Sequence, residues 1–116
     1  MSDKPLFWLG SSRSDLRAFP RDARRVAGFQ LRRVQQGLKP NDWKPMPAVG
    51  PGVQEIRIHT GLEHRVFYVA KFTEGVYVLH VFQKRARKTP KQELELARNR
   101  FRALVMKRRT ESSIGG

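Results

Sequence analysis

One stretch of this 116-residue chain indicates its fold most strongly: Val76-Tyr-Val-Leu-His-Val-Phe-Gln-Lys-Arg-Ala-Arg-Lys-Thr-Pro-Lys91. Its first half is rich in β-branched and aromatic residues, which predicts a strand over Val76 to Gln83. Thr89-Pro90 then predicts a helix start, because Thr is a common N-cap residue and Pro is favoured at the first helical position. Between strand and helix lies a run of cations that a sheet edge can aim at an anionic partner: Lys84, Arg85, Arg87, Lys88 and Lys91.

Charge and composition narrow the class of protein. The 24 Lys and Arg residues against 10 Asp and Glu give a net charge of +14 at pH 7, which favours nucleic acid or an acidic protein as partner. With 39% apolar residues the chain can build one modest core, so we expect a single domain over residues 1–116, frayed from 110 to 116. The absence of cysteine excludes disulfides, and three dispersed histidines make no metal motif, so we expect no metal and no cofactor. Without a leader or an apolar span, we expect a cytoplasmic protein with no membrane partner.

Turn signals before the opening stretch predict a β-meander. Thr60-Gly61-Leu62-Glu63 and Thr73-Glu74-Gly75 separate strands expected at 53–59, 64–72 and 76–83. The Pro- and Gly-rich segment 39–52 predicts a long loop without regular structure.

The N-terminal part predicts one strand and two helices. Residues 4–9 form a short apolar strand, and Ser12 or Ser14 caps a helix that carries Leu16 and Phe19. Pro20 begins a second helix that runs to about Gln36. The chain is therefore of the α+β class, with a third helix after Pro90.

Side-chain alternation sorts the sheet into two faces. One face is expected to pack on the helices, with Ile56, Val66, Tyr68, Leu79 and Val81. The opposite face then gathers cations, an imidazole and an aromatic ring: Arg57, Arg65, His80, Phe82 and Lys84. Such a group suits RNA, because guanidinium forks bind phosphate and aromatic rings stack on unpaired bases.

The same group could cut RNA without a metal. The 2′-hydroxyl is an internal nucleophile, so cleavage needs a base, an acid and cations for the phosphorane. The residues available as general acid or base are Lys84, Lys88, Tyr68 and His80.

Each of these residues also has a structural interpretation. Tyr68 points to the helix-facing side, where its alternative role is that of a core residue, and the alternative role of His80 is that of an ordinary strand histidine. Arg57 and Arg65 could instead pair with Glu55 or Glu63. The cations after Gln83 could simply protect a sheet edge from aggregation.

Several motifs together resemble the phage-derived HigB-like branch of the RelE/ParE toxin superfamily. They run in order over about residues 5 to 107: Leu6-Phe-Trp-Leu-Gly-Ser-Ser12, Asp15-Leu-Arg-Ala-Phe-Pro20, Trp43-Lys-Pro-Met-Pro47, Gly50-Pro-Gly-Val-Gln-Glu-Ile-Arg57, Arg65-Val-Phe-Tyr68, Val78-Leu-His-Val-Phe-Gln-Lys84 and Lys88-Thr-Pro-Lys91. The resemblance implies a RelE-like fold, with N-terminal helices packed on a twisted antiparallel sheet and a C-terminal helix. It also implies a toxin of a type II toxin–antitoxin pair that cleaves messenger RNA in the ribosome, with a HigA-like helix-turn-helix antitoxin as partner.

Carried over by position, the resemblance implies that Arg57 and Arg65 bind phosphate and that Lys84 stabilises charge or transfers a proton. Tyr68 and His80 are further catalytic candidates. The residues expected to position RNA are Lys44, Phe82, Arg85, Arg87, Lys88 and Lys91. The family often has further lysines near the second strand, which are missing here, so the general base is not identified. The alternatives are a non-catalytic ParE-like toxin that binds a protein such as DNA gyrase, and a plain RNA-binding module.

Overall fold

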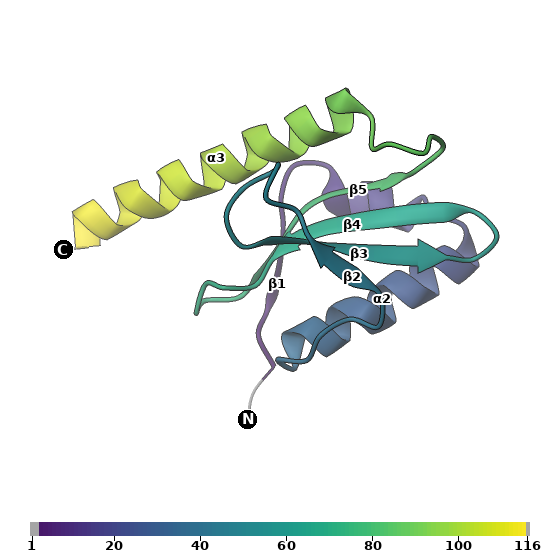
Figure 1. Cartoon of the computed structure of the whole chain (residues 1–116). Helices are drawn as coiled ribbons and strands as arrows, with labels where there is room; N and C mark the ends of the chain where they lie inside the picture. The colour runs from purple at the N-terminus through teal and green to yellow at the C-terminus, as the bar shows by residue number, and fades with distance from the viewer. Residues whose placement is uncertain (1–2, 116) are drawn as a thin grey trace.

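The computed structural model describes residues 3–115 and shows a sheet between two helical layers (Figure 1). The elements run in this order: β1 (Leu6–Trp8), α1 (Ser12–Arg17), α2 (Arg21–Gln35), β2 (Trp43–Pro45), β3 (Val53–His59), β4 (Glu63–Val69), β5 (Val76–Gln83) and α3 (Lys91–Gly115). Helix α2 lies below the sheet in Figure 1, and α3 crosses above it. The α+β class is confirmed.

The five strands are ordered β1-β5-β4-β3-β2. The meander of β3, β4 and β5 is antiparallel, as predicted. The sheet as a whole is mixed, however, because β1 pairs in parallel with β5, and the expectation of a wholly antiparallel sheet is wrong. This pairing joins segments about 70 residues apart, and no local turn signal reveals it.

The segment expected to be an irregular loop contains β2, which pairs antiparallel with β3. β2 is three residues long and lies at the sheet edge, where Pro45 is tolerated because an edge strand needs only one set of ladder bonds. The strand carries Lys44 opposite Glu55.

Both faces of the sheet pack against helices, so the prediction that only one face does so is wrong. On one face, Ile56, Val66 and Tyr68 pack with the apolar stripe of α2. On the other, Phe67 and Leu79 pack with Phe101 of α3, and burial of these apolar side chains supplies most of the stabilisation of the layers. α3 therefore covers much of the face that was expected to hold the site.

A bulge in β5 explains why Leu79 was placed on the wrong face. Phe67 pairs with His80 and Tyr68 with Val78, so Leu79 is an extra residue in β5. The bulge turns Leu79 and His80 to the α3 side together, while Val78 lies on the α2 side. Simple alternation fails at this point.

The helix ends differ slightly from the predicted ones. Ser11, rather than Ser12 or Ser14, precedes α1, and the buried hydroxyl of Ser12 donates to the Val78 carbonyl at 3.2 Å. Pro20 lies just before α2. α3 continues as a helix to Gly115, beyond the point where fraying was expected, and Gly116 lies outside the described residues.

Candidate nucleic-acid interface

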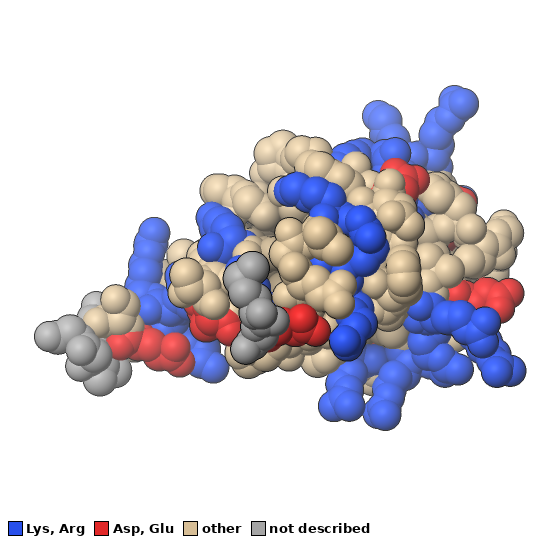
Figure 2. Space-filling view, turned by 90° about the horizontal axis from the view of Figure 1, so that it is seen from below, with Lys and Arg blue, Asp and Glu red and all other residues tan. Residues whose placement is uncertain are grey.

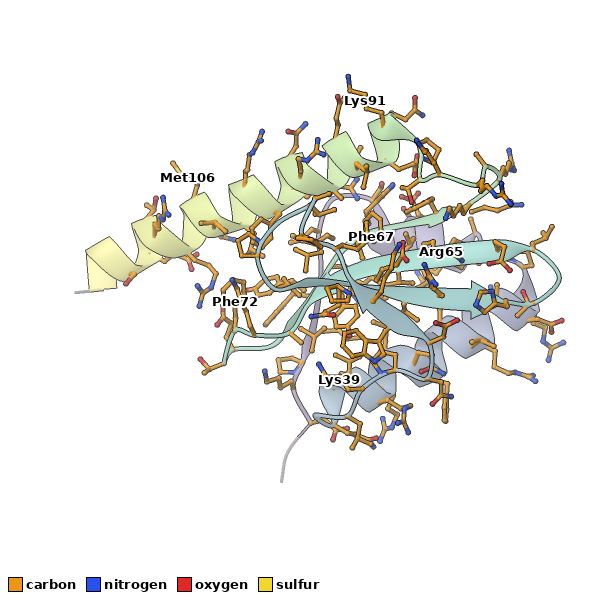
Figure 3. The ribbon with its side chains drawn as sticks, in the orientation of Figure 1. Lys39, Arg65, Phe67, Phe72, Lys91 and Met106 are labelled. Atoms are coloured by element: carbon orange, nitrogen blue, oxygen red, sulfur yellow. The ribbon has the colours of Figure 1, made fainter. Side chains whose placement is uncertain are left out.

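Four cations meet at one end of the α3-facing side of the sheet. We call this group, Lys44, Arg57, Arg65 and Lys84, the cationic cluster. Arg57 and Arg65 are direct cross-strand partners, and the backbone N–H of Lys84 donates to the Glu63 carbonyl at 2.7 Å, which fixes Lys84 beside β4. Figure 3 shows Arg65 nearer than Phe67 to the β3–β4 turn, at the start of β4. The sequence prediction that three of these side chains share one face agrees with this arrangement.

A buried carboxylate lies within the cationic cluster. Glu55 is 1% exposed, and its Oε1 lies 3.2 Å from Nε of Arg57 and 3.9 Å from Nε of Arg65. Its Oε2 has no hydrogen-bond partner among the described residues. From the sequence, Glu55 was expected only as an alternative pairing partner of Arg57 or Arg65, although the alternation Val53, Glu55, Arg57 places all three on one face.

Arg65 is more enclosed than the sequence suggested. The residue is 6% exposed, and its Nη1 donates to Glu63 Oε1 at 3.0 Å and to the His64 carbonyl at 2.9 Å. Its Nε is buried and lacks a hydrogen-bond partner within residues 3–115. Unfilled donors of this kind are rare in folded proteins, so Arg65 retains capacity to donate to a ligand that reaches it.

The surroundings of Lys84 in the cluster lower the pKa of its side chain. Burial lowers the pKa of its ammonium group, and the nearby charges of Arg65, Lys44 and Arg57 lower it further, against the opposing effect of Glu55. A lysine with a lowered pKa gives up its proton more readily, which suits it to proton transfer.

His80 and Phe82 lie under α3. His80 is 7% exposed, and its Nε2 donates to Glu93 Oε2 of α3 at 2.7 Å, while burial lowers the pKa of the imidazole. Phe82 stacks on His80 and meets Phe67 edge-on, and it is 8% exposed. In this structure both side chains hold α3 against the sheet, which agrees with the structural alternative for His80 and leaves Phe82 little surface for a base.

Tyr68 lies on the opposite face from the cationic cluster. It packs in the α2 core with 2% exposure, and burial raises the pKa of its phenol to about 12. Its ring borders a pocket of about 300 Å³ beside the C-terminal end of α2. A catalytic role together with Arg57 and Lys84 is therefore incompatible with this geometry.

Exposed basic residues follow the C-terminal end of β5, next in the chain to Lys84 of the cationic cluster. Arg85, Arg87 and Lys88 are exposed in the connection to α3, and Lys91 is exposed at the first turn of that helix (Figure 3). Arg85 donates to the Gln83 side chain at 3.2 Å, and Lys91 lies 3.8 Å from Glu95. These exposed contacts contribute little stability, so the side chains are available to a polyanion.

No group of three or more His, Asp and Glu side chains within the described part of the chain is arranged to hold a metal ion. Between residues 3 and 115, no helix combines the length and apolar character needed to cross a bilayer.

Comparison with known families identifies the chain. The family model described as phage derived protein Gp49-like (DUF891) matches residues 14–102, which include most of α1, all of α2 and of β2 to β5, and the first half of α3. No curated protein matches the chain. The matched region contains the whole cationic cluster, and the family is one of RelE/ParE-like toxins in general. The chain therefore belongs to the Gp49-like family of phage-derived proteins.

Proposed function

We propose that this protein is a HigB-like toxin of a type II toxin–antitoxin system that cleaves messenger RNA on the ribosome. The observation that carries the proposal is the cationic cluster, in which side chains from β2, β3, β4 and the end of β5 surround one patch of the sheet. Membership of the Gp49-like family supports the toxin part. The proposed partners are a HigA-like helix-turn-helix antitoxin, the ribosome and its messenger RNA.

The chemistry we propose uses the nucleophile that RNA itself carries. The 2′-oxygen attacks the adjacent phosphorus and loses its proton to a base, while the bond from phosphorus to the 5′-oxygen breaks and that oxygen takes up a proton. Arg57 and Arg65 would bind the non-bridging oxygens and stabilise the phosphorane charge. Lys84 is our choice for proton transfer, because burial lowers its pKa. No metal ion takes part in these steps.

The remaining residues have supporting roles in this proposal. Glu55 is too enclosed to take a proton from substrate, and we assign it to holding Arg57 and Arg65 in place. Lys44, Arg85, Arg87, Lys88 and Lys91 would bind flanking phosphates.

The test is induction of the protein in cells followed by primer extension on translated messages. We expect discrete cuts within codons, and we expect Lys84→Ala to abolish them and to relieve growth arrest. Arg102→Ala is the matched control, because Arg102 is exposed on α3 away from the cluster. Arg65→Lys is a second variant for this test, because it keeps the positive charge of Arg65 and removes its guanidinium fork. We choose it over Arg65→Ala, which would leave a cavity at a buried position.

One observation favours a second candidate function. Arg57 and Arg65 are already paired with Glu55 and Glu63, as in a surface that binds rather than catalyses. A non-catalytic ParE-like toxin that binds a protein target such as DNA gyrase would leave transcripts intact and damage DNA. A plain RNA-binding module would bind RNA with strong salt dependence and would not arrest growth.

A further inference from the structure

The outer face of α2 carries a row of arginines that the proposed function does not use. Arg21, Arg25 and Arg32 are separated by four and seven residues, and Gly28 lies between the last two. At 100° per residue these positions share one side of the helix, and the row spans about 16 Å along its axis. All four residues are exposed. We call the three arginines, together with Gly28 between them, the α2 arginine row.

The row lies on the opposite side of the sheet from the cationic cluster. The buried stripe of α2, with Ala23, Ala27 and Leu31, packs on the face that holds Tyr68. The row therefore faces away from the sheet, and Figure 2, drawn from the side that α2 covers, shows Lys and Arg side chains projecting from this part of the molecule. A ligand held by the row would leave the cationic cluster free.

The charges of the row are poorly neutralised. Arg32 lies 3.6 Å from Asp3 with its side chain 67% exposed, a pair that contributes little. Arg21 and Arg25 make no ion pair among the residues that the structure describes. Since they stand one turn apart, their repulsion weakens the helix. A partner that supplies negative charge would remove this cost.

Gly28 is a second, independent feature of the row. A Cβ built at Gly28 would meet no heavy atom within 4 Å, and its φ is not positive, so neither packing nor backbone conformation requires glycine. Glycine inside a helix is less stable than alanine. Glycine at this position would let a partner approach the helix backbone closely between the arginines, because no side chain stands in the way.

Composition favours a polynucleotide over a protein as that partner. The segment 11–36 has seven arginines, no lysine and two aspartates, the arginines being Arg13, Arg17, Arg21, Arg24, Arg25, Arg32 and Arg33. Guanidinium forks match phosphate oxygens. The one large apolar side chain exposed on α2 is Phe29, at 59%, whereas the core of a protein interface is apolar and depleted in charge. Interfaces with nucleic acid are more polar and strongly positive.

The shape of the row favours a duplex over a single strand. Sites for single-stranded nucleic acid combine a basic groove with several aromatic rings on which bases stack. Helix α2 instead offers a convex surface with one exposed aromatic ring. Double-stranded RNA is recognised mainly through phosphate and ribose contacts. We propose that the α2 arginine row docks on the backbone of double-stranded RNA. The choice of RNA over DNA rests on the proposed function.

The test measures binding of the full chain to a fluorescent 20-base-pair RNA duplex by anisotropy over a range of salt concentrations. One variant combines Arg21→Ser, Arg25→Ser and Arg32→Ser. The matched control combines Arg102→Ser, Lys107→Ser and Arg109→Ser, three exposed positions on α3 with the same loss of charge. All proteins carry Lys84→Ala, so that expression does not depend on toxicity, and circular dichroism checks that each is folded.

We expect the row variant to lose at least tenfold in affinity at 100 mM salt and about three units of the slope of log K against log salt, one for each phosphate contact. The control should change the slope by less than one unit. Gly28→Glu should weaken binding with the arginines intact, and Gly28→Ala should leave the helix folded.

Three results would overturn the proposal: equal losses in the row variant and the control, equal affinity for a DNA duplex of the same sequence, or competition by polyglutamate as effective as that by unlabelled RNA. If translated messages are not cut in cells while row-dependent duplex binding persists, the proposed function fails and the docking surface stands.

Discussion

Nε of Arg57 lies 3.2 Å from Oε1 of Glu55, a carboxylate that is 1% exposed and sits on the same strand face two residues earlier. Without that carboxylate, Arg57 and Arg65 would stand as neighbouring like charges on paired strands, which is destabilising. Glu55 thus lets the fold hold two arginines side by side at the end of a sheet.

Glu55→Gln should therefore lower the free energy of unfolding at pH 7 by about 1 to 3 kcal/mol, as expected when one partner of a buried, charge-assisted hydrogen bond is lost. Urea denaturation measures this change. Glu95→Gln is the matched control, since Glu95 is exposed and pairs with Lys91 at 3.8 Å, and it should cost less than about 0.5 kcal/mol. Equal losses in the two variants would contradict the role given to Glu55.

Tyr68→Phe should leave both toxicity and stability nearly unchanged. Tyr68 is on the α2 face, and no described residue forms a hydrogen bond with its hydroxyl, so removing that oxygen costs less than about 1 kcal/mol. Tyr68→Ala should instead cost about 3 to 5 kcal/mol through the cavity that it leaves. A folded Tyr68→Phe protein that no longer arrests growth would return Tyr68 to the catalytic machinery.

Local pattern predicted β5 from Val76 to Gln83, the hairpins and the shared face of Arg57, Arg65 and Lys84, because those features depend on neighbouring residues. Local pattern could not predict how segments far apart in the chain pair and pack together. The parallel pairing of β1, and the packing of α3 over His80 and Phe82, both depend on contacts between residues far apart in the chain. The face of the sheet on which the Leu79 side chain lies depends on one bulge in β5, because a single extra residue reverses the alternation of side chains between the two faces.

His80 and His59 should titrate on opposite sides of 6.5. Burial lowers the pKa of His80, while the hydrogen bonds that the His59 ring donates to Glu63 and then to Asp42 raise the pKa of His59. The contribution of His80 to stability is therefore present above pH 6.5 and is lost as pH falls towards its folded pKa. That of His59 is present below pH 6.5 and is lost as pH rises through its raised pKa. NMR titration of the imidazole signals measures both, with Asp42→Asn expected to bring His59 closer to 6.5. Two superimposed curves would refute the assignment.

Arg108 of α3 anchors the β4–β5 turn, and this contact should be visible in acid. Its Nε donates to Glu74 Oε2 at 2.7 Å, and the guanidinium carbon lies 3.7 Å from the centre of the Phe72 ring. The Arg108 hydrogen bond lowers the pKa of Glu74 to about 2. Since the folded pKa lies below the unfolded value of 4.5, the stabilisation is present above pH 4.5 and is lost as pH falls to about 2.

Glu74→Gln should therefore flatten the dependence of the unfolding free energy on pH between about 4.5 and 2. The effect should stay below about 1 kcal/mol, because water and salt screen a pair in which both side chains are about one third exposed. Thermal unfolding in citrate and glycine buffers gives the curve, and Glu95→Gln should leave it unchanged in shape. High salt should reduce the difference between wild type and Glu74→Gln, since the pair is exposed to screening ions. A wild-type curve that is already flat over this range would show that Arg108 does not hold Glu74 in solution.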